Sequence, residues 1–130
     1  MTKKPSTIAC PCESGKSYSV CCQPYHQGTP TNNAEALMRS RYSAYVLGLE
    51  QYLLATWHPN TRPATLNLNK DVATKWLGLS IKRFEDTSNT TAIVEFIARY
   101  KTGGQKAERL HEVSQFVLTD RWYYVSGEIE

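Results

Sequence analysis

Residues Ala92-Ile-Val-Glu-Phe-Ile-Ala-Arg-Tyr-Lys101 decide the fold class, because this run of β-branched and aromatic residues is typical of a strand. Successive side chains of a strand point to opposite faces of its sheet. The two faces of this strand carry Val94, Phe96 and Ala98 on one side and Glu95, Ile97 and Arg99 on the other. Polar and apolar residues are mixed in this alternation and in that of Leu110–Leu118, so the period alone does not identify the buried face.

Three similar runs accompany this strand and predict a sheet. They are Trp76–Phe84, Leu110–Leu118 and Arg121–Val125. Turn-forming residues separate consecutive runs, at Asp86-Thr-Ser-Asn89, Gly103-Gly104 and Thr119-Asp120. We therefore predict four antiparallel strands joined as a meander, with a tight hairpin at the last of these turns.

Two helices are predicted before the strands. Apolar and aromatic residues recur at helical spacing at Ala34, Leu37, Met38, Arg41, Tyr42, Tyr45 and Val46. Thr31, Asn32 or Asn33 can cap the start of this helix, and Gly48 is expected to end it. A second short helix is expected over Leu49–Thr56, with Pro59 stopping it and a polar loop following through Asn69. Helices followed by a meander predict an α+β fold, with helices packed on one face of a curved antiparallel sheet whose concave face can form a pocket.

The overall composition sets few limits on function. The 130 residues are 41% hydrophobic and carry a formal net charge of +3, which is too small to indicate nucleic-acid binding. No segment approaches the roughly 20 apolar residues that span a bilayer, and Met1–Cys10 lacks the apolar run of a signal peptide. We therefore expect a soluble, cytoplasmic protein that does not act at a membrane.

All four cysteines lie close together, at Cys10, Cys12, Cys21 and Cys22. Zinc prefers four ligands in a tetrahedron and accepts four thiolates, and cysteine clusters of the reducing cytosol more often hold metal than form disulfides. A disulfide within either close pair would be strained, and a catalytic thiol would need only one cysteine. The cluster therefore predicts one structural zinc ion. Four thiolates and one Zn²⁺ would change the net charge from +3 to about +1.

The residues between the cysteines fit a compact zinc-binding loop. Pro11 stiffens the first pair, and Gly15 permits the chain to reverse towards the second pair. Two adjacent cysteines converge on one ion only in a helical turn, so we predict such a turn around Tyr18–Cys22. Backbone amides of residues 14–16 and the Lys16 ammonium are candidate donors to the thiolates.

This stretch resembles the SEC-C motif, a zinc-binding module noted at the tail of the SecA translocation ATPase. The match consists of Cys-Pro-Cys, Ser-Gly-Lys, one tyrosine and Cys-Cys at the spacing of the motif, with Glu13 in place of its usual glycine. Segments such as Leu37–Val46, Thr56–Pro59 and Arg121–Val125 resemble the YchJ family of bacterial proteins. That resemblance implies a zinc-binding module at residues 1–29 and, at residues 30–130, a domain similar to the cone of nuclear transport factor 2. It implies no substrate.

A polar pocket in the cone is a further prediction. Its candidate residues are Arg41, Trp57, His58, Glu95, Arg99, His111 and Glu112. In a catalytic hypothesis, a histidine is the general base, a glutamate orients it and an arginine binds an anion. The alternative is that these charged residues form structural ion pairs and that the histidines and tryptophans pack in the core. We favour this alternative and assign no residue as catalytic.

Two functions follow from these features. We favour a protein-interaction or accessory role, in which zinc orders the N-terminal module as a recognition surface. By analogy with the SecA tail, the partner would be a protein of proteostasis or translation; nucleic acid is not indicated, and RNA stays an alternative because Lys3, Lys4 and Lys16 make the module mildly positive. The competing hypothesis is a small enzyme of the isomerase or dehydratase type, or a small-ligand binder, with its site in the cone.

Overall fold

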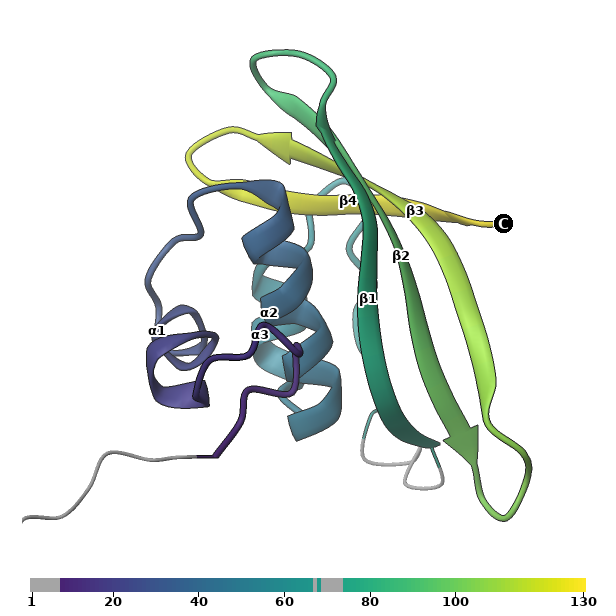
Figure 1. Ribbon diagram of the computed structural model, residues 1–130. Helices are drawn as coiled ribbons and strands as arrows, with labels where there is room; N and C mark the ends of the chain where they lie inside the picture. Colours follow the sequence, from purple (N-terminus) through teal and green to yellow (C-terminus); the bar gives the residue numbers. More distant parts are fainter. Residues whose placement is uncertain (1–7, 67, 69–73) are drawn as a thin grey trace, which may run out of the picture.

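The helices of this chain precede its strands, and α2 stands upright against the sheet (Figure 1). The computed structural model describes residues 8–66, 68 and 74–130. Its elements, in chain order, are η1 (Tyr18–Val20), α1 (Gln23–His26), α2 (Ala34–Leu47), α3 (Glu50–Ala55), β1 (Thr74–Asp86), β2 (Thr91–Thr102), β3 (Glu108–Leu118) and β4 (Trp122–Ile129). The α+β fold class predicted from the sequence is confirmed.

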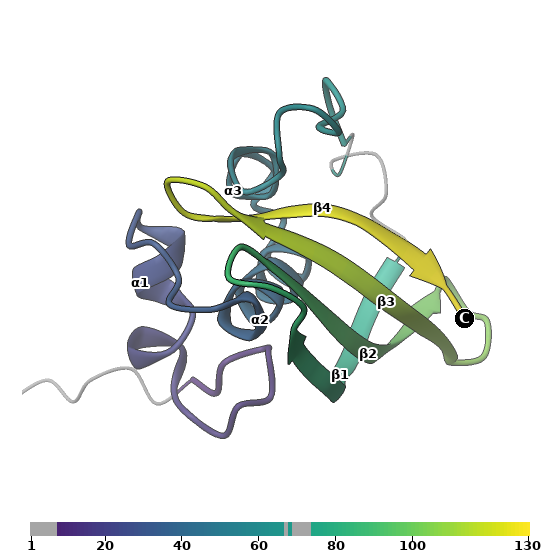
Figure 2. The same ribbon diagram turned by 90° about the horizontal axis from the view of Figure 1, so that it is seen from above.

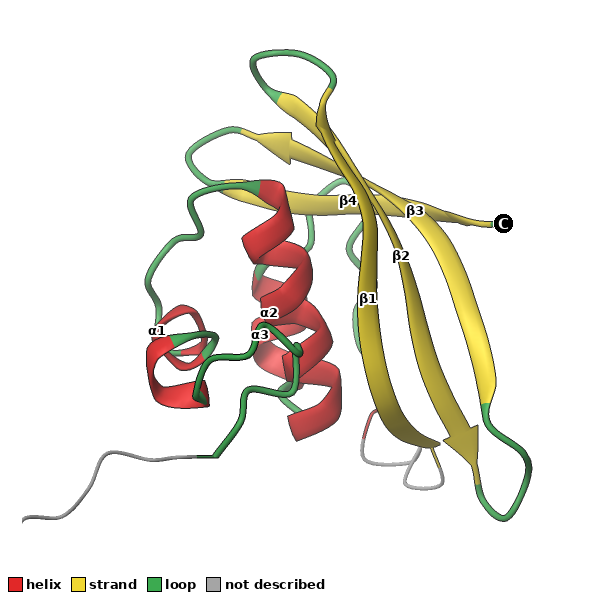
Figure 3. Cartoon of the chain, in the orientation of Figure 1, coloured by secondary structure: helices red, strands yellow, loops and turns green. Residues whose placement is uncertain are grey.

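The four strands form one antiparallel sheet in the order β1-β2-β3-β4, which is the predicted meander. Irregularities in the pairing of β1 and of β3 accompany the strong twist and curvature of the sheet (Figure 3). β4 extends beyond the predicted end at Val125 to Ile129, because Ser126 and Gly127 pair with β3 despite their low strand propensity. β1 likewise begins at Thr74, before the predicted Trp76.

The core lies between α2 and the concave face of the sheet. Val94, Phe96 and Ala98 of β2 are almost fully buried there. From α2, Leu37, Met38 and Tyr42 pack against this face. The alternation of residues along β2 did not identify its buried face. The structure does, because the side of β2 that carries Phe96 faces the helices.

Both predicted ends of α2 are confirmed. The Asn33 side chain accepts a hydrogen bond from the Ala36 N–H at 2.7 Å, so Asn33 is the N-cap among the three predicted choices. Gly48 ends the helix with a φ of 74°, in the left-handed region that glycine adopts without strain. The predicted polar loop through Asn69 lies partly outside the described residues.

The N-terminal segment packs against α2, and its Glu13 side chain also reaches the edge strand β1 beside Gly78. Seen from above, α2 stands between α1 and the sheet (Figure 2). The predicted turn at Tyr18–Cys22 corresponds to η1 and the start of α1. The boundary near residue 30 stays a prediction, and the two portions are in direct contact. No helix in the described ranges has the length and apolar character to cross a bilayer.

Candidate metal centre

The first cysteine pair lies on a tight reversal of the chain. The Glu13 N–H donates to the Cys10 carbonyl at 3.1 Å, and the Cys10 N–H donates to the Lys16 carbonyl at 2.9 Å. Glu13 and Gly15 both have positive φ, 63° and 88°. Gly15 adopts this conformation readily, while Glu13 occupies it at the position where the motif usually has glycine. The reversal turns both sulfur atoms of the pair towards the same side.

The second pair lies at the junction of η1 and α1. The Cys21 N–H donates to the Tyr18 carbonyl at 3.1 Å, which closes the 3-10 turn. Cys22 is the N-cap of α1, and Pro24 lies in the first turn of that helix, where its missing N–H is not needed. Adjacent cysteines can therefore point to one place, as the sequence predicts.

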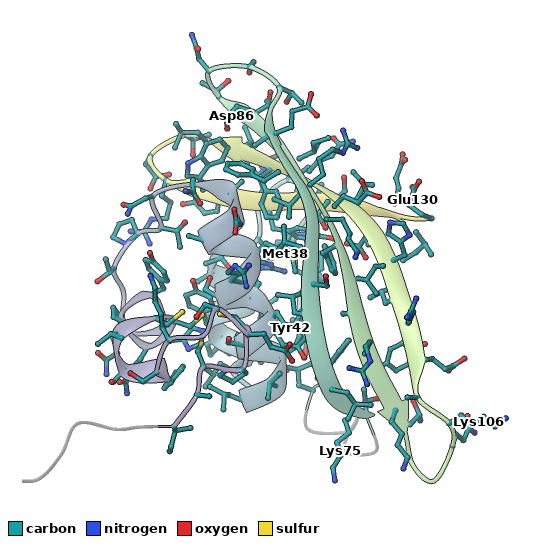
Figure 4. All side chains as sticks on the ribbon, viewed as in Figure 1. Met38, Tyr42, Lys75, Asp86, Lys106 and Glu130 are labelled. Carbon is teal, nitrogen blue, oxygen red and sulfur yellow. The ribbon has the colours of Figure 1, made fainter. Side chains whose placement is uncertain are left out.

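The four sulfur atoms lie within 4.8 Å of one another. Those of Cys12 and Cys21 are 3.5 Å apart. With Zn–S bonds of about 2.3 Å, the sulfur atoms of a regular tetrahedron lie about 3.8 Å apart, so the cluster has the size of a tetrathiolate site. Cys12 and Cys22 are fully buried, Cys10 is 4% exposed, and Cys21 is partly exposed. Figure 4 shows sulfur atoms gathered between the N-terminal segment and α2.

The four thiols are close enough to shift one another's pKa. Hydrogen bonding from Cys22 lowers the pKa of Cys12 to about 4. The same contact with Cys12, together with burial, raises the pKa of Cys22, and burial raises the pKa of Cys21. Thiolates this close repel one another, so the pKa values of neighbouring thiols move in opposite directions. A divalent cation would stabilise all the thiolates together.

Helix α2 supplies polar groups to the cluster. The Ser43 hydroxyl donates to Cys22 Sγ at 3.4 Å, and its Oγ lies 3.5 Å from Cys10 Sγ. Ser14, on the loop, places its Oγ 3.1 Å from Cys21 Sγ. Arg39 of α2 donates from Nη1 to the Cys12 carbonyl at 2.8 Å. The sequence predicted backbone amides of residues 14–16 and the Lys16 ammonium as donors, but the Lys16 N–H donates to Ser14 Oγ at 3.2 Å. The side chains of Ser14, Ser43 and Arg39 were not predicted, because the motif does not specify how α2 packs against it.

A hydrogen-bond chain through His26 joins the module to α2 and, through Ser40 and Tyr52, to α3. Nε2 of His26 lies 2.8 Å from the Ser40 carbonyl, so it must be the protonated nitrogen, and Nδ1 accepts from the Tyr18 hydroxyl at 2.6 Å. The ring contacts Tyr52 edge-on at 4.7 Å, and the Tyr52 hydroxyl lies 2.7 Å from Ser40 Oγ. Burial lowers the pKa of His26. No sequence pattern assigned a role to His26, although the fully buried Ser40 and Ser43, three residues apart, mark one side of α2.

Two of the predicted pocket residues, Arg41 and Trp57, pack together beneath the sheet. Arg41 is 3% exposed, and its Nη1 donates to the Leu53 carbonyl and to Thr56 Oγ1, both at 2.8 Å. Its Cζ lies 5.0 Å from the centre of the Trp57 ring and 4.4 Å from that of Tyr124. Within the described residues, the buried Trp57 Nε1 has no hydrogen-bond partner.

The predicted pocket residues do not line one common pocket. Glu112 pairs with Phe96 across β2 and β3, so it lies on the inner face with Arg41. His111 pairs with Ile97, so His111 and Glu95 share the outer face. There, His111 Nε2 lies 2.7 Å from Glu95 Oε2, and Arg83 donates to the other oxygen of Glu95 at 3.2 Å.

Arg99 and His58 occupy two further places. Arg99 lies on the outer face near Gly78, where the Glu13 carboxylate would be 2.7 Å from any added Cβ. His58 lies after α3, where its N–H donates to the Tyr124 carbonyl at 2.8 Å and its Nδ1 accepts from the Asn60 N–H at 3.1 Å. Glu95, Arg99 and His111 therefore lie on the outer face of the sheet, away from Arg41 on the inner face. This geometry corrects the hypothesis that a histidine, a glutamate and an arginine share one pocket inside the cone.

Comparisons with known proteins agree with both parts of this description. Residues 33–127 match the family model described as the YchJ middle domain, which is similar to nuclear transport factor 2, and residues 8–24 match the SEC-C motif. A UPF0225 protein of Chromobacterium violaceum is 55% identical over 97% of this chain and 96% of its own length. One from Bordetella parapertussis is 51% identical over 99% of each chain.

Solved structures of similar proteins have the same arrangement. The solution structure of a SEC-C motif-containing protein from Rhodopseudomonas palustris has a TM-score of 0.83 and 36% identity, and the match covers 93% of this chain and 98% of that one. The crystal structure of a SEC-C motif-containing protein from Psychrobacter arcticus has a TM-score of 0.81 and 31% identity, over 96% of this chain and 84% of that one.

Proposed function

This chain belongs to the YchJ family of UPF0225 proteins that carry a SEC-C motif, and we propose that its cysteines bind one structural zinc ion that orders a protein-interaction surface. The observation that carries the proposal is the convergence of four sulfur atoms to within 4.8 Å of one another. Thiolate ligands in a tetrahedron select zinc or iron among the common metals. Four protein ligands leave no open position on zinc, so the ion would hold structure and perform no reaction.

The ion would attach the module to α2 as well as close its loop. Ser43 lies beside the sulfurs of both Cys10 and Cys22, and Arg39 holds the Cys12 carbonyl. These polar groups stabilise negative charge on the cluster, which a site with four thiolates and one Zn²⁺ retains. A fixed orientation of the module on α2 is what a recognition surface requires, because binding to a preformed surface loses less conformational entropy.

The surface that would meet a partner lies over the second cysteine pair. A groove of about 390 Å³ there is lined by residues that include Lys16, Val20, Tyr25 and Arg39. Val20 is 67% exposed, and an apolar side chain so exposed fits a protein segment that carries apolar residues. The charge of Arg39 in this groove is already paired with Glu35 at 3.2 Å, so the apolar contact carries the argument. We place this role in the cytoplasm, where cysteines stay reduced and available to metal.

Metal analysis of the purified full chain tests the first half of the proposal. We expect one zinc per chain by plasma mass spectrometry, and replacement by Co²⁺ should give the visible absorption of a tetrahedral tetrathiolate site. A Ser14→Ala variant should keep the full metal content, whereas Cys12→Ser should lose it. Iron in place of zinc, or metal retained by Cys12→Ser, would contradict the proposal.

Capture of partners by Val20→Ser tests the second half. Val46→Ser is the matched control, because Val46 is also exposed, at 38%, but is not among the residues that line the groove. We expect proteins cross-linked to the zinc-loaded chain in bacterial lysate to be lost with Val20→Ser and retained with Val46→Ser. Equal capture by both variants, or capture that disappears on RNase treatment, would exclude a protein partner on this groove.

A further inference from the structure

A second feature of the molecule, separate from the cysteine cluster, is a cavity of about 220 Å³ between α2 and the inner face of the sheet. Its apolar side includes Trp76, Phe96 and Leu110, and its polar side includes Arg41, Tyr45 and Glu112. Tyr45, Trp76 and Leu110 are only half-buried, so the cavity reaches the surface beside them. It is therefore a partly open pocket in which charge and aromatic surface meet.

The positive charge in this cavity forms no ion pair among the described residues, although the Glu112 carboxylate lines the same cavity and attracts it. Arg41 is 3% exposed, and none of the ion pairs among the described residues includes it. Its Nη1 donates to the Leu53 carbonyl and to Thr56 Oγ1, and its guanidinium also bonds to the Tyr45 side chain. A guanidinium has five N–H groups, so these three bonds leave donors for a ligand. A guanidinium stays charged at any physiological pH, so this buried cation gains from an acceptor in the cavity.

The negative charge in the cavity is held in place by the pairing of β3 and β4. Glu112 Oε2 accepts a hydrogen bond from the buried Ser114 hydroxyl at 2.7 Å. Ser114 pairs with Gly127 of β4, and a Cβ at Gly127 would overlap Glu112 Oε2. Glycine at that position therefore leaves the space that the carboxylate occupies. A side chain there would displace Glu112 from the cavity.

Arg41 and Glu112 thus line one cavity at a separation greater than that of an ion pair. We propose that this cavity binds a small, uncharged, ring-sized molecule carrying a carboxamide-like group. Its carbonyl oxygen accepts from Arg41, its N–H donates to Glu112, and its ring lies against Trp76 and Phe96.

Charge balance and size both select this class of ligand. A ligand with a net charge would leave either Arg41 or Glu112 uncompensated in a largely apolar cavity, which is costly, whereas a neutral dipolar group satisfies both. An apolar cavity of about 150 Å³ admits benzene, so one of about 220 Å³ has room for a ring with one small substituent.

Three planar probes of nearly equal shape test the charge argument: benzamide, benzoate and benzamidinium, which are neutral, anionic and cationic. We titrate each into the full-length, zinc-loaded chain and follow the indole N–H resonance of Trp76 by NMR. Benzamide should bind most tightly, with a Kd of about 1 mM or lower, as expected for so few atoms. A preference of the native chain for benzoate or benzamidinium, or no saturable shift with any probe, overturns the proposal.

Glu112→Gln then tests the role assigned to the carboxylate. With Glu112 neutralised, only the Arg41 charge remains, so selectivity should move from benzamide towards benzoate by about tenfold. Glu95→Gln is the matched control, because it makes the same change on the outer face of the sheet, and its selectivity should equal that of the native chain. An unchanged selectivity in Glu112→Gln, in a variant that NMR shows to be folded, also overturns the proposal.

Discussion

The N-terminal module and the sheet domain are stabilised in different ways. The sheet side has a continuous apolar core that runs from Leu37 on α2 to Phe116 on β3. The module has only the buried sulfur atoms of Cys10, Cys12 and Cys22, with Tyr18 and Cys21 packed around them. So few apolar residues cannot bury enough surface to offset the entropy of ordering the loop. The module is therefore expected to depend on the proposed metal and on α2, whereas the sheet depends on hydrophobic burial.

Removing one metal ligand is expected to have the largest effect on stability, and that effect should fall on the N-terminal module and not on the sheet. In Cys12→Ser, a fully buried ligand is lost, and the free energy of metal binding that folds the module is lost with it. We expect the amides of residues 8–26 to lose nearly all protection from hydrogen exchange, while β2 and β3 stay protected. Ser14→Ala is the control, since it changes a neighbour of the cluster without removing a ligand. Equal loss of protection in the sheet would show that the two regions fold as one unit.

Truncating a side chain in the core of the sheet should destabilise the sheet domain and leave the affinity of the module for zinc almost unchanged. Phe116 is 1% exposed and packs in the main core, so Phe116→Ala should lower the free energy of unfolding by about 3–5 kcal/mol. Urea unfolding followed by tryptophan fluorescence measures this loss. The affinity for zinc, measured by competition with a chelator in the native state, should stay within about twofold, because no core residue of the sheet touches the sulfurs. A large drop in zinc affinity would disprove the separation.

The sequence predicted the parts of each region that depend on local pattern. Four clustered cysteines indicate a metal whatever surrounds them, and the alternation of Ala92–Lys101 predicts a strand in any α+β fold. The pattern could not choose between the two faces of that strand, because Ile97 is as apolar as the buried Ala98 beside it. Packing of α2 made that choice.

The predicted pocket was grouped incorrectly for a related reason. Whether His111 or Glu112 faces α2 depends on the register of β3 against β2, and a shift by one residue exchanges the two faces. The contacts of Ser43 with the cysteine sulfurs and of His26 with α2 were missed, because they form only when the N-terminal segment packs on α2. Such tertiary contacts leave little local signal beyond buried serines at helical spacing.

The contact between the two regions is expected to have an intermediate effect. His26→Phe keeps an aromatic ring against Tyr52 but removes the hydrogen bonds to Tyr18 and to the Ser40 carbonyl. Because both partners lose a satisfied polar group, we expect the free energy of opening the module to fall by about 1–3 kcal/mol, as measured by native-state hydrogen exchange. His58→Phe is the matched control, since its ring bonds only locally to Asn60. If His58→Phe opens the module equally, the network through His26 is not the link between the regions.

Substituting a charged residue on the outer face of the sheet should have the smallest effect on stability, because the charges there are in contact with water. Hydrogen bonding to His111, and then to Arg83, lowers the pKa of Glu95. A carboxyl group with a depressed pKa in the folded state contributes stability above its unfolded pKa, and that contribution is lost as the pH falls through the folded value. Exposed pairs of this kind contribute little. We therefore expect Glu95→Gln to change the midpoint of urea unfolding at pH 7 by no more than experimental error.

The pairing of Glu95 is still visible by titration. In the native chain, carboxyl carbon NMR should give Glu95 a pKa below its ordinary value of 4.5, and His111→Asn should move it upward, because the first of its two partners is lost. Asp120 serves as an internal reference, because hydrogen bonding from Thr119 lowers its pKa and His111 has no part in that shift. A Glu95 titration that is the same in both proteins would show that the bond to His111 is not formed in solution. The charged residues on the outer face would then contribute nothing to the stability of either region.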